Sequence, residues 1–349
     1  MDEQYYTFLN TVKSRLRPIR TSKGRDPRMT EDAGRAAYDI DPELAEFAEL
    51  MAAMPPLTNV QDGRDMILEF VGPLNAGIDT SGLDIDDRTI PGPPDAPDVT
   101  VRVYRPHGIA PPVPAVLKIH GGGFTTGSIE TEHGMDVELC RELGIVVVSV
   151  EYRLAPEHPF PAGLDDCYAA LVWLHGTAES LGVDPARIAL KGGSAGGGLA
   201  AAVALLARDR GGPPICFQYL SAPELDDRLE TESMRQFVDT PVWNRPSAER
   251  SWAWYLGDVL RDEVSEYAAP ARATSLAGLP PAYISTMQYD PMRDEGILYA
   301  VRLLQAGVSV ELHSWPGTFH GSQVVSDAAV TQRENTEMMA VLRRALDLH

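Results

Sequence analysis

The amino-acid sequence predicts an α/β protein whose mostly parallel central sheet is flanked by helices. From about residue 83, short β-rich runs alternate with helical stretches, which is the pattern of a parallel sheet covered on both faces. The run GIVVVSVEY at 144–152 is apolar almost throughout, as expected of a strand buried on both sides. The length of 349 residues allows one to three domains.

The chain before about residue 75 is predicted to be helical. Its clearest segment is DPELAEFAELMAAM at 41–54, in which Asp41 is expected to cap the helix and Pro42 to occupy its first position. After residue 83 we expect strands at 99–106, 114–120, 144–152, 187–193, 215–221, 282–290 and 308–315. Helices are expected between them, at 132–143, 164–181, 195–208 and 294–305, with a last one from 326.

One segment interrupts the alternation. Residues 225–279 contain no clear strand but hold three of the five tryptophans, Trp243, Trp252 and Trp254. We interpret the segment as an insertion that packs with the N-terminal helices over one end of the sheet. The alternative, which is the better expectation for each tryptophan taken singly, is that these side chains fill an ordinary helical core.

Composition excludes several classes of function. The net charge of −20 argues against a nucleic-acid role, because phosphate binding needs a basic surface. The three cysteines, Cys140, Cys167 and Cys216, are expected to be reduced thiols rather than a disulfide framework or a zinc site. The longest apolar run, 199–207, is about half of what a membrane span needs, and the N-terminus lacks the features of a signal peptide. We therefore expect a cytoplasmic protein with no membrane or nucleic-acid partner.

The stretch IALKGGSAGGGL at 188–199 places five glycines around Ser194. Because a predicted strand precedes it and a predicted helix follows, residues 192–196 form a G-x-S-x-G motif in the context of a nucleophile elbow. In that turn, side chains two residues before and after the serine would collide, which explains Gly192 and Gly196. The helix N-terminus at Ser194 also favours developing negative charge.

Two other glycine motifs fit this stretch less well. A phosphate-binding P-loop needs G-K-[ST] after its glycines, and that sequence does not follow here. Gly196, Gly198 and Ala201 match a loose dinucleotide pattern, but they lie inside the predicted helix rather than at its start. G-x-S-x-G alone is a modest signal, so its interpretation depends on the rest of the chain.

A second glycine-rich segment, IHGGGFTTGS at 119–128, follows the predicted strand at 114–120. Three glycines after His120 can turn backbone N–H groups inward to form an oxyanion hole together with the N–H of Ala195. The alternative is a simple turn between strand and helix, which the pairing with the serine motif disfavours. For His120 itself we expect a structural hydrogen bond.

Candidates for a general base and its acidic partner follow the last two predicted strands. His320 in WPGTFHGSQ lies at the carboxyl end of a strand, where it can reach a serine at the same sheet edge. Asp290 in QYDPMRDEG directly follows another strand, although Asp before Pro is also a helix N-cap pattern. Asp294 is the competitor and is expected to pair with a nearby arginine. The order Ser, Asp, His is that of α/β-hydrolases.

Taken together, the motifs resemble the hormone-sensitive-lipase family of α/β-hydrolases, the bacterial family IV esterases. HGGGF, VEYRLAPEHPFPAGLDD, GGSAGG, YDPMRDEG and FHG carry the resemblance from about residue 114 to 321. It implies an α/β-hydrolase catalytic domain at 76–349 and a helical cap formed by 1–75, with 225–279 contributing. The implied site residues are the triad Ser194, Asp290 and His320 and the oxyanion donors Gly122, Gly123 and Ala195.

By this resemblance the protein is a serine carboxylesterase that hydrolyses short-chain esters through an acyl-enzyme, with a small neutral ester as substrate and no metal or cofactor. A lactone or amide hydrolase uses the same groups. A non-catalytic receptor is the second hypothesis, since the plant gibberellin receptor has this fold but lacks the catalytic histidine. The chain departs from the family at Gly193, where an acidic residue is usual. The oligomeric state stays open, a homodimer included.

Overall fold

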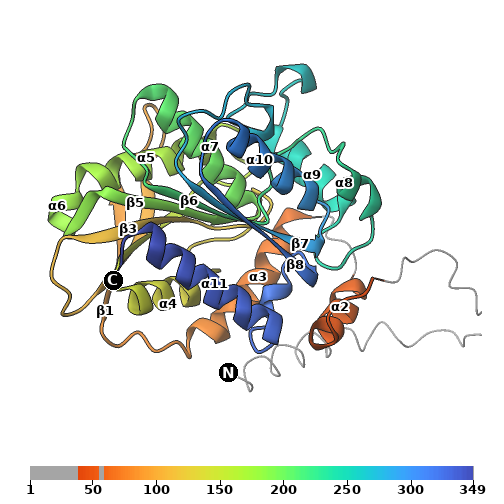
Figure 1. Ribbon diagram of the computed structural model, residues 1–349, viewed down its shortest axis with the longest axis horizontal. Helices are drawn as coiled ribbons and strands as arrows, with labels where there is room; N and C mark the ends of the chain where they lie inside the picture. Colours follow the sequence, from red (N-terminus) through yellow and green to blue (C-terminus); the bar gives the residue numbers. More distant parts are fainter. Residues whose placement is uncertain (1–37, 55–58, 349) are drawn as a thin grey trace, which may run out of the picture.

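The computed structural model describes residues 38–54 and 59–348 (Figure 1). The remaining parts of the predicted N-terminal helical region, 1–37 and 55–58, lie outside the described residues. Within the described part, a short 3-10 helix η2 (Pro42–Leu44) leads into α2 (Ala45–Ala52), and α3 spans Val60–Asn75. The Asp41 carboxylate accepts the N–H of Glu43, and Pro42 opens the helix, as the sequence predicted.

An eight-stranded sheet forms the centre of the molecule, in the order β1-β2-β4-β3-β5-β6-β7-β8. β2 runs antiparallel to β1 and β4, and every pair from β4 to β8 is parallel. All seven predicted strands are confirmed, and β1 is an eighth that the sequence analysis missed. The strands are β1 (Leu83–Ile90), β2 (Val99–Pro106), β3 (Val113–Ile119), β4 (Val146–Glu151), β5 (Val183–Gly193), β6 (Phe217–Ser221), β7 (Ala282–Tyr289) and β8 (Val310–Phe319).

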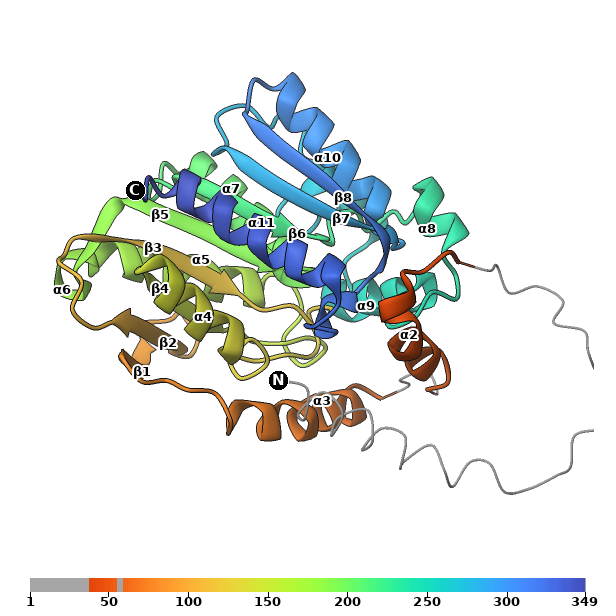
Figure 2. The same cartoon turned by 60° about the horizontal axis from the view of Figure 1, so that its bottom comes forward.

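Helices cover both faces of the sheet (Figures 1 and 2). One face carries α4 (His133–Leu143) and α11 (Ala329–Ala345). The other carries α5 (Ala162–Gly176), α6 (Ala178–Leu181), α7 (Ala195–Arg210) and α10 (Arg293–Gln305). The helix predicted at 164–181 is therefore two helices, because Thr177, with φ −108° and ψ 8°, leaves the helical conformation.

The apolar strands have buried side chains on both faces because each face has its own helical layer. In β3, Leu117 packs toward α7, whereas Val116 packs toward α4 and α11. The strand β4 repeats this alternation, with Val148 and Val147 on opposite faces and both fully buried. This arrangement confirms the prediction made from the continuous apolar run.

The predicted insertion, all of whose residues the structure describes, contains no strand. It holds α8 (Glu232–Gln236), α9 (Arg245–Leu256) and two short 3-10 helices, Arg261–Glu263 and Pro270–Arg272. Trp252 on α9 is buried, as the alternative of an ordinary helical core predicts, and lies against Phe124 with ring centroids 5.5 Å apart. The insertion thus packs directly on the segment that follows β3.

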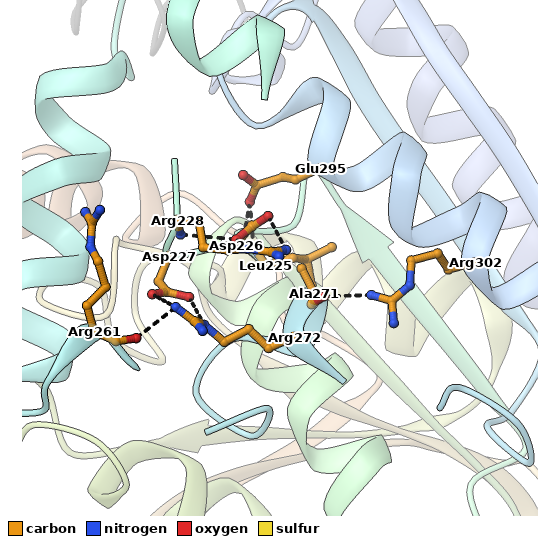
Figure 3. A network of polar contacts seen from close by, with 9 residues as sticks. All are labelled: Leu225, Asp226, Asp227, Arg228, Arg261, Ala271, Arg272, Glu295 and Arg302. Atoms are coloured by element: carbon orange, nitrogen blue, oxygen red, sulfur yellow. Dashed lines mark hydrogen bonds and ion pairs between the residues drawn. The ribbon is translucent and has the colours of Figure 1, made fainter. Parts of the chain in front are cut away.

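Buried polar contacts fix both ends of the insertion (Figure 3). At its start, Glu295 of α10 accepts the backbone N–H groups of Leu225 at 2.6 Å and Asp226 at 3.3 Å. Near its end, the Arg272 guanidinium donates to both carboxylate oxygens of Asp227, at 2.6 and 2.8 Å. A bidentate pair of this kind with a buried carboxylate fixes orientation as well as distance.

The described N-terminal helices lie against the same end of the sheet as the insertion (Figure 2). Phe47 of α2 belongs to an apolar cluster with Trp315 and Phe319 at the end of β8. Arg64 of α3 donates to the carbonyl of Thr125 at 2.7 Å, within the second glycine-rich segment. Among helices in the described ranges, none combines the length and apolar character that crossing a membrane requires.

Candidate active site

Ser194 occupies a sharp turn between β5 and α7, which we call the serine turn (residues 192–198). Its φ of 56° and ψ of −128° are unusual for a residue with a side chain. A Cβ on Gly192 would lie 2.1 Å from the carbonyl oxygen of Gly196, and a Cβ on Gly196 would lie 2.2 Å from that of Ile119. The predicted collisions are therefore present, and only glycine fits these two positions.

The other glycines of the serine turn differ in what they require. A Cβ on Gly198 would meet the carbonyl oxygen of Glu224 at 2.1 Å, and one on Gly197 would meet Pro223 at 2.9 Å. At Gly193, in contrast, the nearest atom would be the carbonyl oxygen of Ser221 at 3.7 Å, an ordinary contact. Four of the five glycines are sterically required, and Gly193 is the position with room for a side chain.

The three residues predicted as a triad come together at the carboxyl ends of the strands. His320 Nε2 lies 3.0 Å from Ser194 Oγ, and His320 Nδ1 lies 2.7 Å from Asp290 Oδ2. The other Asp290 oxygen accepts the N–H of Met292 at 2.9 Å, so this carboxylate also makes the N-cap type of contact considered above. Because a carboxylate only accepts, Nδ1 carries the imidazole hydrogen and Nε2 is left to accept from the serine. Asp294 pairs with Arg293, as predicted.

Gly121, Gly122 and Gly123 form a loop, here called the glycine loop, next to Ser194. A Cβ on Gly121 would lie 3.0 Å from the carbonyl oxygen of Gly193 and 3.4 Å from Ser194 Cβ. Gly122 and Gly123 have φ values of +123° and +57°, which favour glycine. The glycine loop therefore needs glycine both for its backbone conformation and for its close approach to the serine turn.

Every carbonyl of the glycine loop has a donor. His120 Nδ1 donates to the oxygen of Gly121 at 2.8 Å, and the N–H of Thr126 donates to that of Gly122 at 2.9 Å. The oxygen of Gly123 accepts the hydroxyl of Ser251 at 3.0 Å. The backbone N–H groups of Gly122, Gly123 and Phe124, and that of Ala195 at the start of α7, have no acceptor within the described residues.

The donors on these carbonyls fix the direction of the neighbouring N–H groups in the glycine loop. In a planar trans peptide the C=O and N–H point in opposite directions, so a donor on one carbonyl fixes the direction of the next N–H. The contacts to Gly121 and Gly122 thus orient the N–H groups of Gly122 and Gly123. Burial lowers the pKa of His120 to about 4, which keeps its ring neutral and its structural role constant near neutral pH.

Trp243, from the insertion, lies beside the site, although it was not predicted to be a site residue. Its ring lies 5.8 Å from the His320 ring, and a Cβ on Gly123 would lie 2.7 Å from its Cη2 atom. No local pattern marks this residue, because it stands in an irregular stretch and reaches the site only through the fold. Trp252 is buried in the core, whereas Trp243 is half-buried and packs both against the core and against the site.

A second buried carboxyl, Glu224, also lies beside the site and was missed. Its N–H donates to the carbonyl of Ser194 at 3.0 Å, and both side-chain oxygens are buried with no hydrogen-bond partner among the described residues. Burial raises the pKa of Glu224 to about 8, the adjacent Ser251 hydroxyl opposes part of this rise, and Asp290 adds to it. Its place just after β6, at the same edge as Ser194, was the sequence signal available.

Comparisons with known proteins agree with this geometry. Residues 116–324 match a family model described as the alpha/beta hydrolase fold. The carboxylesterase NlhH of Mycobacterium tuberculosis is 39% identical over 322 residues, covering 89% of this chain and 98% of NlhH. A solved bacterial heroin esterase is 51% identical, with a TM-score of 0.85, over 88% of this chain and 98% of that one.

A further solved structure, the esterase LipW from Mycobacterium marinum, is 37% identical with a TM-score of 0.80 and covers 88% of this chain and 96% of its own. These relatives match nearly their whole length, so the similarity extends beyond the catalytic motifs. The chain belongs to the alpha/beta hydrolase family, among the hormone-sensitive-lipase-type carboxylic ester hydrolases.

Proposed function

We propose that this carboxylic ester hydrolase uses Ser194 as nucleophile, His320 as general base and Asp290 as the residue that orients the imidazole. The observation that carries the proposal is the continuous contact from Ser194 Oγ to His320 and on to Asp290, at 3.0 and 2.7 Å. The relatives named carboxylesterase and esterase support ester hydrolysis as the reaction.

In the first half of the reaction, His320 Nε2 takes the hydroxyl proton while Ser194 Oγ attacks the ester carbonyl carbon. The carbonyl oxygen becomes an oxyanion, which the N–H groups of Gly122, Gly123 and Ala195 bind. His320 then donates its proton to the departing alcohol as the ester C–O bond breaks, leaving an acyl-enzyme. Asp290 stabilises the transient imidazolium throughout.

In the second half, His320 deprotonates a water molecule, which attacks the acyl-enzyme through the same oxyanion geometry. The proton returns to Ser194 Oγ as its bond to the acyl carbon breaks, and the carboxylic acid leaves, giving its own proton to water near neutral pH. Because the net charge is −20, the acidic surface favours release of this anionic product. The cycle needs a neutral ester and water only.

We further propose that the substrate carries a short acyl chain. Trp243 supports this, because its indole lies close to both the His320 ring and Gly123 and so restricts the space beside the reacting carbonyl. A series of p-nitrophenyl esters from acetate to decanoate tests it, with kcat/KM expected to peak at short chains. Trp243→Ala should move the peak to longer chains, whereas Trp254→Ala on α9 should leave the profile unchanged. An unmoved peak in Trp243→Ala would contradict the proposal.

The domain division is part of the same proposal: a cap built from 1–75 with a contribution from 225–279, above a catalytic domain at 76–349. The packing of α2 on Trp315 and Phe319 and of α9 on Phe124 supports it. We also propose a cytoplasmic location, with which the three free cysteines are consistent. Light scattering on the purified protein checks for the homodimer.

Hydrolysis of p-nitrophenyl acetate by the purified protein tests the function. The wild-type chain should release p-nitrophenol steadily, and Ser194→Ala should not. Turnover that persists undiminished in Ser194→Ala would reject Ser194 as the nucleophile. No release from the wild-type chain with any of the esters would reject the proposed activity itself.

A further inference from the structure

Two side chains from outside the glycine-rich motifs hold the two ends of the glycine loop. Glu132, at the start of α4, accepts the N–H of Gly121 at 3.1 Å. Ser251, on α9 of the insertion, donates to the carbonyl of Gly123 at 3.0 Å. The first N–H and the last C=O of the three-glycine loop are therefore both occupied by side chains, one from each side.

The Ser251 contact is well defined because the residue is buried and its helix is fixed. Ser251 is 2% exposed, and it lies 128 positions from the glycine it contacts. α9 packs on the glycine loop's neighbour Phe124 through Tyr255, whose ring is stacked on it at 3.8 Å. The hydroxyl therefore cannot turn to water, and its single hydrogen is given to Gly123.

Glu224 completes the surroundings of Ser251. Its carboxyl lies next to the Ser251 hydroxyl, and both of its oxygens are buried with no hydrogen-bond partner among the described residues.

The Glu132 contact has an independent anchor in the sheet. Lys118 of β3, fully buried, forms an ion pair with the second oxygen of Glu132. This holds the carboxylate so that its first oxygen faces Gly121. Asp136 of α4 also lies near Lys118, so a carboxyl group remains beside the lysine if Glu132 is replaced by a neutral residue.

We propose that Ser251 and Glu132 are positioning residues for the oxyanion hole, which hold the glycine loop so that its free N–H groups meet the developing oxyanion. The inference rests on the proposed function of that loop. It makes the insertion part of the catalytic apparatus through one hydroxyl, rather than only a cover for the substrate. Neither residue touches the reacting atoms, so each acts through the glycine backbone alone.

The test compares variants that lose a contact with variants that keep it. Ser251→Ala and Glu132→Ala remove the donor and the acceptor, whereas Ser251→Thr and Glu132→Gln retain a hydroxyl and a carbonyl oxygen. Ser247→Ala is the matched control, because Ser247 lies one turn earlier on α9 and its hydroxyl bonds to Asn244 instead. The fraction of active sites in each preparation is counted by fluorophosphonate labelling of Ser194 in a separate sample.

We expect kcat to fall about 10- to 100-fold in each alanine variant with KM little changed, because misplacement of catalytic groups by about 1 Å costs on this order. The affinity for a trifluoromethyl ketone, whose adduct places an oxyanion in the hole, should fall by the same factor. The affinity for the corresponding methyl ketone, which does not form such an adduct, should stay unchanged. Ser251→Thr, Glu132→Gln and Ser247→Ala should stay within about threefold of wild type.

Equal losses for both ketones, or unchanged kcat and trifluoromethyl ketone affinity in the alanine variants, would overturn the inference. Those results leave the proposed function standing if wild-type Ser194 is labelled and active. If wild-type Ser194 is not labelled, the proposed function fails instead. Should the buried Ser251→Ala variant not fold, the Glu132 pair decides the question, because the Glu132 side chain is 25% exposed and its replacement is less disruptive.

Discussion

The serine turn and the glycine loop lie side by side, and both depend on glycine, but they keep their shapes by different means. The serine turn is constrained by steric contacts of its glycines, since a Cβ on Gly192 would strike the carbonyl oxygen of Gly196 four residues later and a Cβ on Gly196 would strike that of Ile119 at the end of β3. The glycine loop is held by contacts from Glu132 and Ser251, the second of which is 128 positions away. The glycines of the motif therefore mark the first shape in the sequence, whereas the side chains that hold the second shape carry no such mark.

The largest expected effect on kcat comes from removing the His320 side chain, on which the chemistry at both the serine turn and the glycine loop depends. His320→Ala should lower kcat by about 10⁴- to 10⁶-fold, because the base is lost while the oxyanion hole remains. Single-turnover and steady-state rates with p-nitrophenyl acetate measure this effect. A loss of less than about 100-fold would mean that another group accepts the serine proton, and the contact at 3.0 Å would then have no catalytic meaning.

The second prediction tests the local constraint on the serine turn. Gly192→Ala places a methyl group about 2 Å from a backbone oxygen, so the turn must move and Ser194 with it. We expect kcat/KM to fall about 100-fold and the free energy of unfolding to fall by about 1–3 kcal/mol. Kinetics and urea denaturation of the purified variant check both. Wild-type values would show that the turn is not sterically fixed.

The third prediction concerns Glu224, which contacts the serine turn through its backbone and Ser251 through its side chain. The pKa of this carboxyl is about 8 in the folded protein and 4.5 for the ordinary group, so the folded state holds the proton longer. Stability is therefore fully present below about pH 4.5 and is lost as pH rises toward 8, at up to about 1.4 kcal/mol per pH unit.

Glu224→Gln should remove this loss, because the amide does not ionise. The difference in unfolding free energy between variant and wild type should thus grow in favour of the variant from pH 5 to 8, as measured by urea denaturation at each pH. The other titratable groups around Glu224 are the same in the wild type and the variant, so their contributions cancel in this difference. These groups are Asp290, Tyr152, Tyr255 and Glu295. Parallel pH curves would show that Glu224 is already ionised in the folded protein.

The smallest effect is expected at Gly193, the serine-turn glycine with room for a side chain. Gly193→Ala makes contacts no closer than 3.7 Å, and the backbone there is not left-handed. Restricting the unfolded chain should raise the free energy of unfolding by about 0.4–1 kcal/mol. A loss comparable to that of Gly192→Ala would show that the two positions are constrained alike.

The difference between local sequence patterns and contacts from distant segments also explains what could be predicted from the sequence. Apolar runs predicted seven strands, but β1, with Asp84, Asp86 and Asp87, lacks that signal and is held at the edge by pairing with β2. Ser194, Asp290 and His320 were predictable because each follows a strand whose carboxyl end lies at one edge. Trp243 and Ser251 were not, because they come from a segment without sheet register and reach the site only through packing.

The central claim is that Ser194, activated by His320, is the nucleophile. Mass spectrometry after treatment with a fluorophosphonate tests it most directly, since the reagent bonds to an activated serine. The account predicts one adduct per chain, located on the peptide that contains Ser194, with no adduct in Ser194→Ala and very slow labelling in His320→Ala. An adduct at another residue, or labelling of Ser194 that is equally fast without His320, would contradict it.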